Sequence, residues 1–308
     1  MRIIVIGQAA FGAGVLAGLL ASREEVVAAY APPDLPGKAA DAFKIAALDH
    51  NVPVIQPQTF KDDQVFAEYC DFKPDLAVLA FVPRIIPVRY LEWPTHDSIC
   101  FHPSLLPRHR GASAINWALI MGDTQTGISI FWPDAGIDTG PILLQRKIGI
   151  GPDETAGSLY FNHLFPMGIE ALVESVNLIK AGNAPRMAQT GDGATYEPPC
   201  DDRVAGIDWD KPAGEVYNLI RGCDPQPGAY AFWEKGKIRF YGARLLSEDS
   251  AAKPGSVIQI GAAGMHIAVK GGILDVGKIH SDLTGKLTAA KYASGSGLKE
   301  GDRFVTNH

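Results

Sequence analysis

The chain has 308 residues, a length that suits two medium-sized domains better than one small one. Hydrophobic residues make up 46% and charged residues 20%, which excludes a disordered protein, and no apolar run approaches the roughly 20 residues that cross a bilayer, so no membrane partner is expected. The net charge of −6 opposes general attraction to nucleic acid; residues 1–204 hold 15 Lys and Arg against 23 Asp and Glu (−8), and residues 205–308 hold 13 against 11 (+2).

The first half of the chain alternates apolar runs, which predict strands, with segments of helical spacing. Such alternation implies parallel pairing through right-handed crossovers, so we expect an α/β fold with a Rossmann-like open, mostly parallel sheet. The predicted strands cover residues 1–7, 26–30, 52–55, 76–81, 98–101, 127–132 and 142–150, and the predicted helices cover residues 11–22, 40–51 and 155–182. No signal-peptide cleavage site follows the first strand, which favours a cytoplasmic protein.

The second half of the chain is rich in predicted strands. A polar, Pro- and Gly-containing stretch over residues 184–205 has the composition of a linker. After one helical segment, short β runs alternate with Gly-containing turns, a spacing that predicts a small, OB-like β-barrel. These runs cover residues 230–233, 237–241, 256–260, 265–269 and 272–277, and the helical segment covers residues 213–221. We therefore expect domains over residues 1–189 and 205–308, joined by a linker over residues 190–204.

A glycine-bounded turn, residues 7–12, connects the first predicted strand to the first helix. Such a turn can hold a phosphate on the backbone N–H groups of a helix N-terminus. The segment matches neither the GxGxxG nor the Walker pattern, and we therefore favour a structural turn.

A histidine follows the short strand predicted over residues 98–101. His102 begins an irregular, Pro- and Gly-rich segment that continues to Trp117. Because ligands of parallel sheets bind beyond the strand ends and an imidazole titrates near neutral pH, His102 is a candidate for proton transfer. The alternative is a hydrogen-bonded packing residue.

An acidic, glycine-containing loop, residues 133–140, follows the strand that ends at Trp132. Loops at strand ends often carry function, but Asp and Gly are also ordinary turn residues, and composition alone favours a plain turn. A carboxylate that meets His102 could orient the imidazole and hold a water or an amine, a pairing used in acyl transfer. Sequence spacing does not establish that contact.

Neither the cysteines nor the histidines indicate a metal site. The cysteines lie far apart without a CxxC pair, which argues against a zinc knuckle, a redox motif or a disulfide scaffold and favours reduced thiols; they are Cys70, Cys100, Cys200 and Cys223. Three histidines are candidate ligands: His96, His102 and His109. The neighbouring Arg108 and Arg110 would oppose binding of a cation. We expect no metal.

These motifs resemble the active site of the folate-dependent formyltransferase family, whose members take a formyl group from 10-formyltetrahydrofolate. The family's histidine precedes Ser-Leu-Leu-Pro, as His102 precedes residues 104–107, and its aspartate precedes x-Gly, as Asp138 precedes residues 139–140. The chain is most similar to the amino-terminal hydrolase domain of 10-formyltetrahydrofolate dehydrogenase and next to methionyl-tRNA formyltransferase. Further segments that carry the likeness are residues 131–132, 164–166 and 193–197, with 207–209 and 221–230 for the barrel. The resemblance implies the formyltransferase fold, with a folate-binding catalytic domain over residues 1–189.

The resemblance also implies roles for individual residues. His102 would donate a proton or a hydrogen bond to the oxyanion that forms on the formyl carbon, and Asp138 would hold His102 and the attacking water or amine. The loop after the strand at residues 76–81 would form one wall of the pterin pocket, and the acidic loop would close the other side; without the resemblance, an ordinary strand end is the simpler interpretation. The implied cofactor-binding residues are Phe81, Arg84, Ile85, Ile86, Ser104, Pro133, Asp134, Ala135, Gly136 and Ile137.

Cys100 departs from the family pattern. The transferases place an asparagine two residues before the histidine as a second donor to the oxyanion, and this chain has Cys100 there. A thiol is a weak donor, and loss of one oxyanion donor can lower a rate on the order of a hundredfold. Because the dehydrogenase's hydrolase domain also lacks that asparagine, Cys100 favours this relative. Cys100 is a catalytic candidate, although a buried small hydrophobic residue is a simpler role for it than a covalent nucleophile.

Three functions are open at this point. The first is an enzyme that removes the formyl group from 10-formyltetrahydrofolate, with water as the favoured acceptor or a separate carrier or dehydrogenase partner. The second is a formyltransferase for an amine; a small amine or amino-sugar fits better than methionyl-tRNA, because the second domain has a balance of only +2. A glycinamide ribonucleotide acceptor fits least, because residues 7–12 lack a phosphate-binding pattern. The third is a folate-binding protein without catalysis.

The dehydrogenases join their hydrolase domain to a carrier domain and an aldehyde dehydrogenase domain. Because this sequence ends at His308, we expect 10-formyltetrahydrofolate as the formyl donor and no nicotinamide cofactor in this chain.

Overall fold

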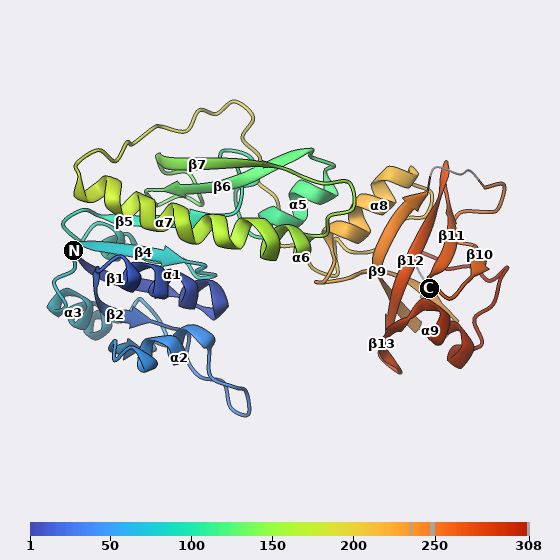
Figure 1. Cartoon of the computed structure of the whole chain (residues 1–308), viewed down its shortest axis with the longest axis horizontal. Helices are drawn as coiled ribbons and strands as arrows, with labels where there is room; N and C mark the ends of the chain where they lie inside the picture. The colour runs from blue at the N-terminus through green and yellow to red at the C-terminus, as the bar shows by residue number, and fades with distance from the viewer. Residues whose placement is uncertain (235, 247–249, 307–308) are drawn as a thin grey trace. The chain divides into compact units, whose positions relative to one another are not determined.

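The structure, a computed structural model, describes residues 1–234, 236–246 and 250–306, and Figure 1 labels its elements. The strands are β1 (Arg2–Gly7), β2 (Glu25–Tyr30), β3 (Val54–Ile55), β4 (Leu76–Ala80), β5 (Ser98–His102), β6 (Gln125–Phe131), β7 (Ile142–Gly149), β8 (Ala229–Trp233), β9 (Gly236–Leu246), β10 (Val257–Ile260), β11 (Met265–Val269), β12 (Gly272–Ser281) and β13 (Gly285–Thr288). The helices are α1 (Ala9–Ala21), α2 (Ala42–Asp49), α3 (Asp63–Asp71), α4 (Val88–Leu91), α5 (Ala114–Ile120), α6 (Ala156–Leu159), the π-helical η1 (Tyr160–Leu164), α7 (Phe165–Lys180), α8 (Ala213–Gly222) and α9 (Ala289–Ser296). Within the described ranges, no helix is long and apolar enough to cross a membrane.

The chain forms two compact units. The first comprises residues 1–111, 127–148 and 162–196, and the second comprises residues 112–126, 149–161 and 197 onward. The domain limits expected at residues 189 and 205 stay a prediction.

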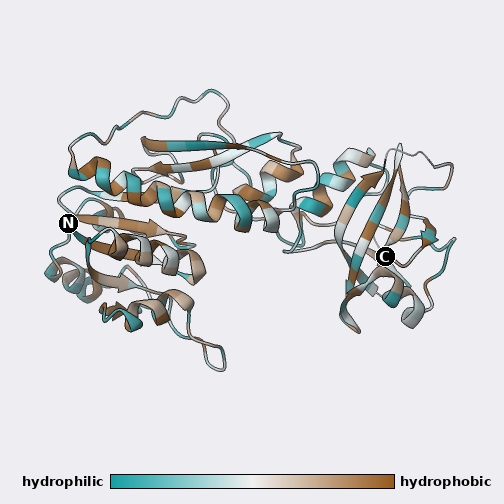
Figure 2. Ribbon diagram, viewed as in Figure 1, coloured by the Kyte–Doolittle hydropathy of each residue, from teal (hydrophilic) through white to brown (hydrophobic). Residues whose placement is uncertain are grey.

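The first unit is built on a seven-stranded sheet with the order β3-β2-β1-β4-β5-β6-β7. β1 pairs in parallel with β2 and β4, and β4 pairs in parallel with β5, whereas β5 and β6 are antiparallel. β1 and β4 consist almost entirely of buried apolar residues, as a sheet covered on both faces requires, and Figure 2 shows them brown. The predicted α/β fold with a mostly parallel sheet is confirmed.

Side chains alternate between the two faces of this sheet along β5. Phe101 points to the face covered by α1, where its ring centroid lies 4.4 Å from that of Phe11. Cys100 packs on the opposite face, against an apolar cluster that includes Tyr69 of α3. Since His102 is two residues beyond Cys100, it shares this second face, and it stands at the carboxyl end of the strand.

The second unit contains a six-stranded antiparallel sheet with the order β10-β11-β12-β9-β8, and β13 pairs with β12. The edge strands β8 and β10 are linked by residues 301–305. Phe232 of β8 and Val257 of β10 are each hydrogen-bonded to this segment through the backbone. The segment therefore connects the two edges of the sheet, as the predicted β-barrel requires.

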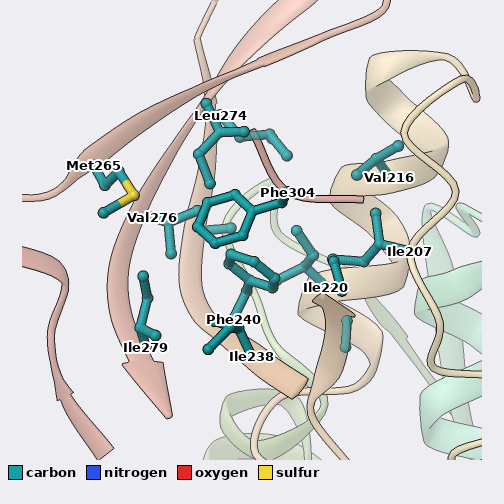
Figure 3. Packing of buried hydrophobic residues seen from close by; sticks show 14 of the residues in the cluster. Ile207, Val216, Ile220, Ile238, Phe240, Met265, Leu274, Val276, Ile279 and Phe304 are labelled. Carbon is teal, nitrogen blue, oxygen red and sulfur yellow. The ribbon is translucent and has the colours of Figure 1, made fainter. Parts of the chain in front are cut away.

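The core of the second unit lies between its sheet and α8. Figure 3 shows Phe240 and Phe304 together with Ile220 of α8, and all three side chains are fully buried. The two phenyl rings meet edge-to-face with centroids 5.0 Å apart. Aromatic pairs in this geometry stabilise a core beyond the area that they bury.

Sequence patterns missed α3, α4, α5, α9 and β13. These elements are short, and α3 fully buries only Tyr69. Its beginning is set by an N-cap, where the Asp62 carboxylate accepts the Gln64 N–H at 2.8 Å. The helix predicted over residues 155–182 is interrupted by η1, and Pro166, which has no N–H to donate, lies in the first turn of α7. Figure 2 shows α7 alternating brown and teal, as expected for a helix with one buried face.

Asp202 ties the polar segment before α8 to β9. Its carboxylate accepts hydrogen bonds from Lys237 Nζ at 2.8 Å and from Arg239 Nη1 and Nη2 at 2.9 Å. The hydrogen bonds from Arg239 and Lys237 lower the pKa of Asp202 to about 2. A carboxyl group whose pKa is depressed on folding stabilises the protein above its unfolded pKa, and that stability is lost as the pH falls through the folded pKa.

We therefore expect Asp202→Asn to lower the free energy of unfolding by about 1 kcal/mol at neutral pH, a modest value because the group is partly exposed to solvent. The difference from wild type should shrink as the pH falls from about 4 toward 2. Urea titrations over that range measure it, with Asp210→Asn at an exposed position of the same segment as the control. A difference that does not change with pH would contradict the assignment.

Candidate active site

His102 is a buried histidine at the carboxyl end of β5, with 6% of its surface exposed. Its ring Nε2 lies 2.7 Å from the carbonyl oxygen of His109. A carbonyl oxygen only accepts hydrogen bonds, so Nε2 carries the hydrogen and donates it. The other ring nitrogen, Nδ1, lies 3.5 Å from Asp138 Oδ2. The structure therefore brings together the histidine and the aspartate that the sequence patterns singled out.

Asp138 lies in the loop that leaves β6. Because β6 runs antiparallel to β5, with Phe131 opposite Cys100, the loop begins beside Cys100 and not beyond His102. The Asp138 backbone is in the left-handed region (φ 54°), and its Oδ2 also accepts the Gly111 N–H at 2.8 Å. The carboxylate is therefore held near the sheet face that carries Cys100 and His102.

The rest of this loop is closed by its own hydrogen bonds. The Asp134 carboxylate accepts the Gly136 N–H at 2.9 Å and the Thr139 hydroxyl at 2.6 Å. At Gly140, a Cβ atom would lie 1.8 Å from the carbonyl oxygen of Trp132, so only glycine fits there. These contacts give the Asp-x-Gly pattern a structural reason: the glycine lets the chain turn back closely enough to present Asp138.

Gln189 and Thr195 form hydrogen bonds to the two residues that contact His102, which are Asp138 and His109. Gln189 Nε2 donates to the carbonyl oxygens of Asp138 and Gly140, each at 2.8 Å, and its Oε1 accepts from the Arg110 guanidinium at 2.7 Å. Thr195 Oγ1 accepts the N–H of His109 at 2.8 Å, and the carbonyl of His109 holds His102.

The sequence patterns did not assign roles to Gln189 and Thr195, because the composition around them is that of a linker. The resemblance of residues 193–197 to the family was the signal that this stretch does more than connect.

Three residues at or beside this site are among the non-glycine residues with a left-handed backbone, which also occur elsewhere in the described part of the chain. Phe81, His109 and Asp138 all have positive φ values, of 63°, 54° and 54°. Such conformations are uncommon outside glycine and persist where the surroundings enforce them, often at functional sites. Two of the three are the histidine and aspartate that contact His102, and the third begins the predicted pterin wall.

The predicted pterin-wall residues have different environments. Phe81 and Arg84 line a pocket of about 150 Å³ beside the ends of β1, β2 and β4, together with Tyr30 and Phe60. Ile85 is 84% exposed.

The other predicted cofactor-binding residues are divided between core and surface. The side chain of Ile86 lies in the apolar cluster of the first unit. Ser104 is fully buried, and its hydroxyl donates to the Arg108 carbonyl at 2.6 Å. The loop residues Asp134, Ala135, Gly136 and Ile137 are exposed and Pro133 is half-buried. Contact of these residues with folate stays a prediction.

Cys100 points to the same sheet face as His102. Its side chain packs against two apolar clusters, and burial, with a further contribution from the charge of Asp138, raises the pKa of the thiol. A thiol with a raised pKa stays protonated at neutral pH, and the thiolate is the nucleophilic form. The geometry therefore favours a neutral, weak S–H donor at this position over a covalent nucleophile.

The turn at residues 7–12 binds a carboxylate side chain of the protein itself. The Ala9 N–H at the start of α1 donates to both carboxylate oxygens of Asp41, at 2.9 and 3.0 Å. A carboxylate therefore occupies the position where a phosphate would meet this backbone N–H, which supports the interpretation as a structural turn.

Among the residues that the structure describes, no three His, Cys, Asp or Glu side chains are grouped as a metal site.

Comparison with known proteins identifies the family. The formyl transferase profile matches residues 1–176, and the profile of the formyl transferase C-terminal domain matches residues 201–297. The chain belongs to the formyl transferase family. As a member of this family, it is an enzyme of formyl-group chemistry.

Individual relatives place the chain within the formyl transferase family. Mitochondrial 10-formyltetrahydrofolate dehydrogenase of Mus musculus is 44% identical over 278 residues, which are 85% of this chain and 30% of that protein. Methionyl-tRNA formyltransferase of Geobacter metallireducens is 34% identical over 309 residues, which are 99% of this chain and 98% of that protein. The structure of HypX from Aquifex aeolicus in complex with tetrahydrofolic acid shares the fold, with a TM-score of 0.70 and 20% identity over 97% of this chain and 48% of that one.

The chain spans about a third of the length of the dehydrogenases that it matches. Both mitochondrial and cytosolic dehydrogenases are among these relatives, so a cytoplasmic location stays a prediction.

Proposed function

We propose that this enzyme removes the formyl group from 10-formyltetrahydrofolate with water as the favoured acceptor, giving formate and tetrahydrofolate. The observation that carries the proposal is the His102–Asp138 pair, with Nδ1 and Oδ2 3.5 Å apart and Nε2 fixed on the His109 carbonyl. The tetrahydrofolic acid bound in the HypX structure of the same fold supports folate as the formyl donor. Residues 1–189 would form the catalytic domain, residues 190–204 the linker and residues 205–308 the β-barrel domain.

The tautomer of His102 determines what the pair can do. Because Nε2 carries the hydrogen, the neutral ring presents an unprotonated Nδ1 to Asp138 Oδ2. Nδ1 and Oδ2 are then both hydrogen-bond acceptors. An attacking water can satisfy both by donating one O–H to each. When Nδ1 is protonated instead, its N–H is too far from Oδ2 for a strong hydrogen bond and remains available to an oxyanion.

The proposed reaction then balances with these two groups. In the form of His102 in which both ring nitrogens carry hydrogen, the water oxygen bonds to the formyl carbon while Asp138 takes one water proton, and Nδ1–H donates a hydrogen bond to the oxyanion and keeps its proton. The bond from the formyl carbon to the folate nitrogen breaks next, and the nitrogen takes up the proton that Asp138 received. The other product is formic acid, which loses its remaining proton to solvent as formate; tetrahydrofolate is released, and the pair returns to its starting state.

The direct test is to mix the purified protein with 10-formyltetrahydrofolate, without any amine, and to follow formate and tetrahydrofolate. Release supports water as a competent acceptor. Binding of 10-formyltetrahydrofolate without release would redirect the search to amine acceptors, and absence of binding would contradict folate as the donor. Binding without formyl loss to water or to any amine would indicate a folate-binding protein.

The second candidate is transfer of the formyl group to an amine. The match to methionyl-tRNA formyltransferase over 98% of that protein favours it. The higher identity to the dehydrogenases, and the cysteine in place of the transferases' asparagine, favour water.

Cys100→Asn tests this choice. An asparagine at position 100 would lie on the same sheet face as His102 and would supply an amide N–H donor where the buried thiol is a weak one. We expect amine formylation to rise on the order of tenfold to a hundredfold if the missing donor limits transfer. Formylation of a panel of amines by wild type and variant measures this, with Cys70→Asn as the control cysteine substitution. No change in the Cys100 variant would remove the lost-donor argument.

Thr195 is expected to position His102 through His109. Thr195→Val keeps the shape of the side chain but removes the hydroxyl that accepts the His109 N–H. Loss of one such hydrogen bond corresponds to about 1 kcal/mol, so we expect kcat for formyl release to fall roughly fivefold, with little change in KM. Thr195→Ser, which restores the hydroxyl, should recover kcat. Equal losses in the Val and Ser variants would indicate a packing role only.

A further inference from the structure

Cys200 and Cys223 are in contact within the second unit, although they are 23 positions apart in the sequence. Their sulfur atoms lie 3.7 Å from each other, at hydrogen-bonding distance for two thiols. Cys223 follows the last residue of α8 and is fully buried, whereas Cys200 is partly exposed. The spacing of the cysteines in the sequence gave no indication of this pair, because the fold creates it.

Cys200 is partly exposed and borders a pocket. The pocket has a volume of about 650 Å³, and its other lining residues are Ser113, Asn116, Asp201, Asp202, Arg203, Gln226 and Pro227. Hydrogen bonds fix the backbone on both sides of the pair: the Cys200 N–H donates to Ser113 Oγ at 3.1 Å, and Asn116 Nδ2 donates to the Gly222 carbonyl at 2.7 Å. The two sulfur atoms are therefore held together, with Cys200 bordering a pocket that is large enough for a peroxide.

The four thiols differ in acidity. The hydrogen bond from Cys223 lowers the pKa of Cys200, and the same hydrogen bond, with burial, raises the pKa of Cys223. Burial raises the pKa values of Cys70 and Cys100. Since the thiolate is the reactive form, Cys200 should be the most reactive of the four cysteines.

We propose that Cys200 and Cys223 form a reactive dithiol site that hydrogen peroxide oxidises to a disulfide. The Cys200 thiolate attacks one peroxide oxygen; the S–O bond forms, the O–O bond breaks, and the leaving hydroxide takes a proton to become water. The sulfur of Cys223 then attacks the Cys200 sulfenic acid; the S–S bond forms, the S–O bond breaks, and the hydroxyl leaves as water with the Cys223 proton. Two thiols lose two electrons in total, and one peroxide is reduced to two waters.

The test is timed oxidation of the folded wild-type chain with hydrogen peroxide, followed by alkylation of the remaining thiols and non-reducing tryptic mapping. Arg203 and Arg221 lie between the two cysteines, so a disulfide joins two separate tryptic peptides. We expect this cross-linked peptide to form while Cys70 and Cys100 stay reduced, with Cys200 lost on the order of tenfold faster than either. In Cys223→Ser the cross-link should disappear, and a sulfenic acid on Cys200 should become trappable with dimedone.

Three results would overturn the proposal. The first is oxidation of Cys200 no faster than that of Cys70; the second is oxidation of Cys200 to higher acids in the wild-type chain without a cross-link. The third is a cross-link that forms only after unfolding in guanidinium. Because these three results are read from the masses of wild-type peptides, they do not depend on the proposed activity or on the folding of any variant.

Discussion

Replacement of His102 by alanine is expected to lower the rate of formyl release from 10-formyltetrahydrofolate by about 10²- to 10⁴-fold, the range for loss of a general acid or base. The imidazole is the group whose Nδ1 faces Asp138 and whose Nε2 is committed to the His109 carbonyl. Without it, the oxyanion on the formyl carbon loses its charged donor. Single-turnover release of tetrahydrofolate, with binding measured separately, distinguishes loss of chemistry from loss of affinity.

Two further variants make this result interpretable. His102→Gln retains a side-chain amide that can donate to the His109 carbonyl but cannot become a cation, so it should fold like wild type and remain impaired. His96→Ala, at an exposed histidine before β5, should keep full activity. Full turnover in His102→Ala would remove this residue from the mechanism.

The sequence predicted the strands of the sheet more completely than the contacts of the site, because strands leave a local sequence pattern and these contacts do not. Buried strands such as β1 and β4 are continuous apolar runs, a local pattern that by itself indicates a parallel sheet. Short helices such as α3, with one fully buried residue, leave no comparable pattern. Periodicity therefore recovers the elements that bury most surface and misses short helices with one or two buried residues.

The contact between His102 and Asp138 had no local signal. Only the resemblance to the family placed the two residues in one site, because β6 is antiparallel to β5 and its loop must fold back to reach the imidazole. Gln189 and Thr195 were hidden for a related reason, since polar residues that hydrogen-bond to backbone groups of distant loops have the composition of a linker. Long-range polar contacts depend on the fold as a whole and leave little trace in neighbouring residues.

Asp138→Asn is the most discriminating single change in this site. The amide oxygen of asparagine can still accept the Gly111 N–H, so the left-handed loop should keep its shape. The amide lacks the negative charge that would stabilise a protonated His102 and is not a proton acceptor for the attacking water. We expect formyl release to fall on the order of 10²- to 10⁴-fold, with thermal stability and folate affinity close to those of wild type.

Asp134→Ala, which removes the oxygen that accepts both loop hydrogen bonds, separates the charge of Asp138 from the integrity of its loop. Asp134 lies in the same loop, but its carboxylate is engaged with Gly136 and Thr139, so its replacement should loosen the loop and raise KM more than it lowers kcat. If Asp138→Asn instead kept wild-type turnover, Asp138 would be a structural loop residue and His102 would act alone. If both variants lost kcat equally, the order of the loop, and not the carboxylate of Asp138, would govern the reaction.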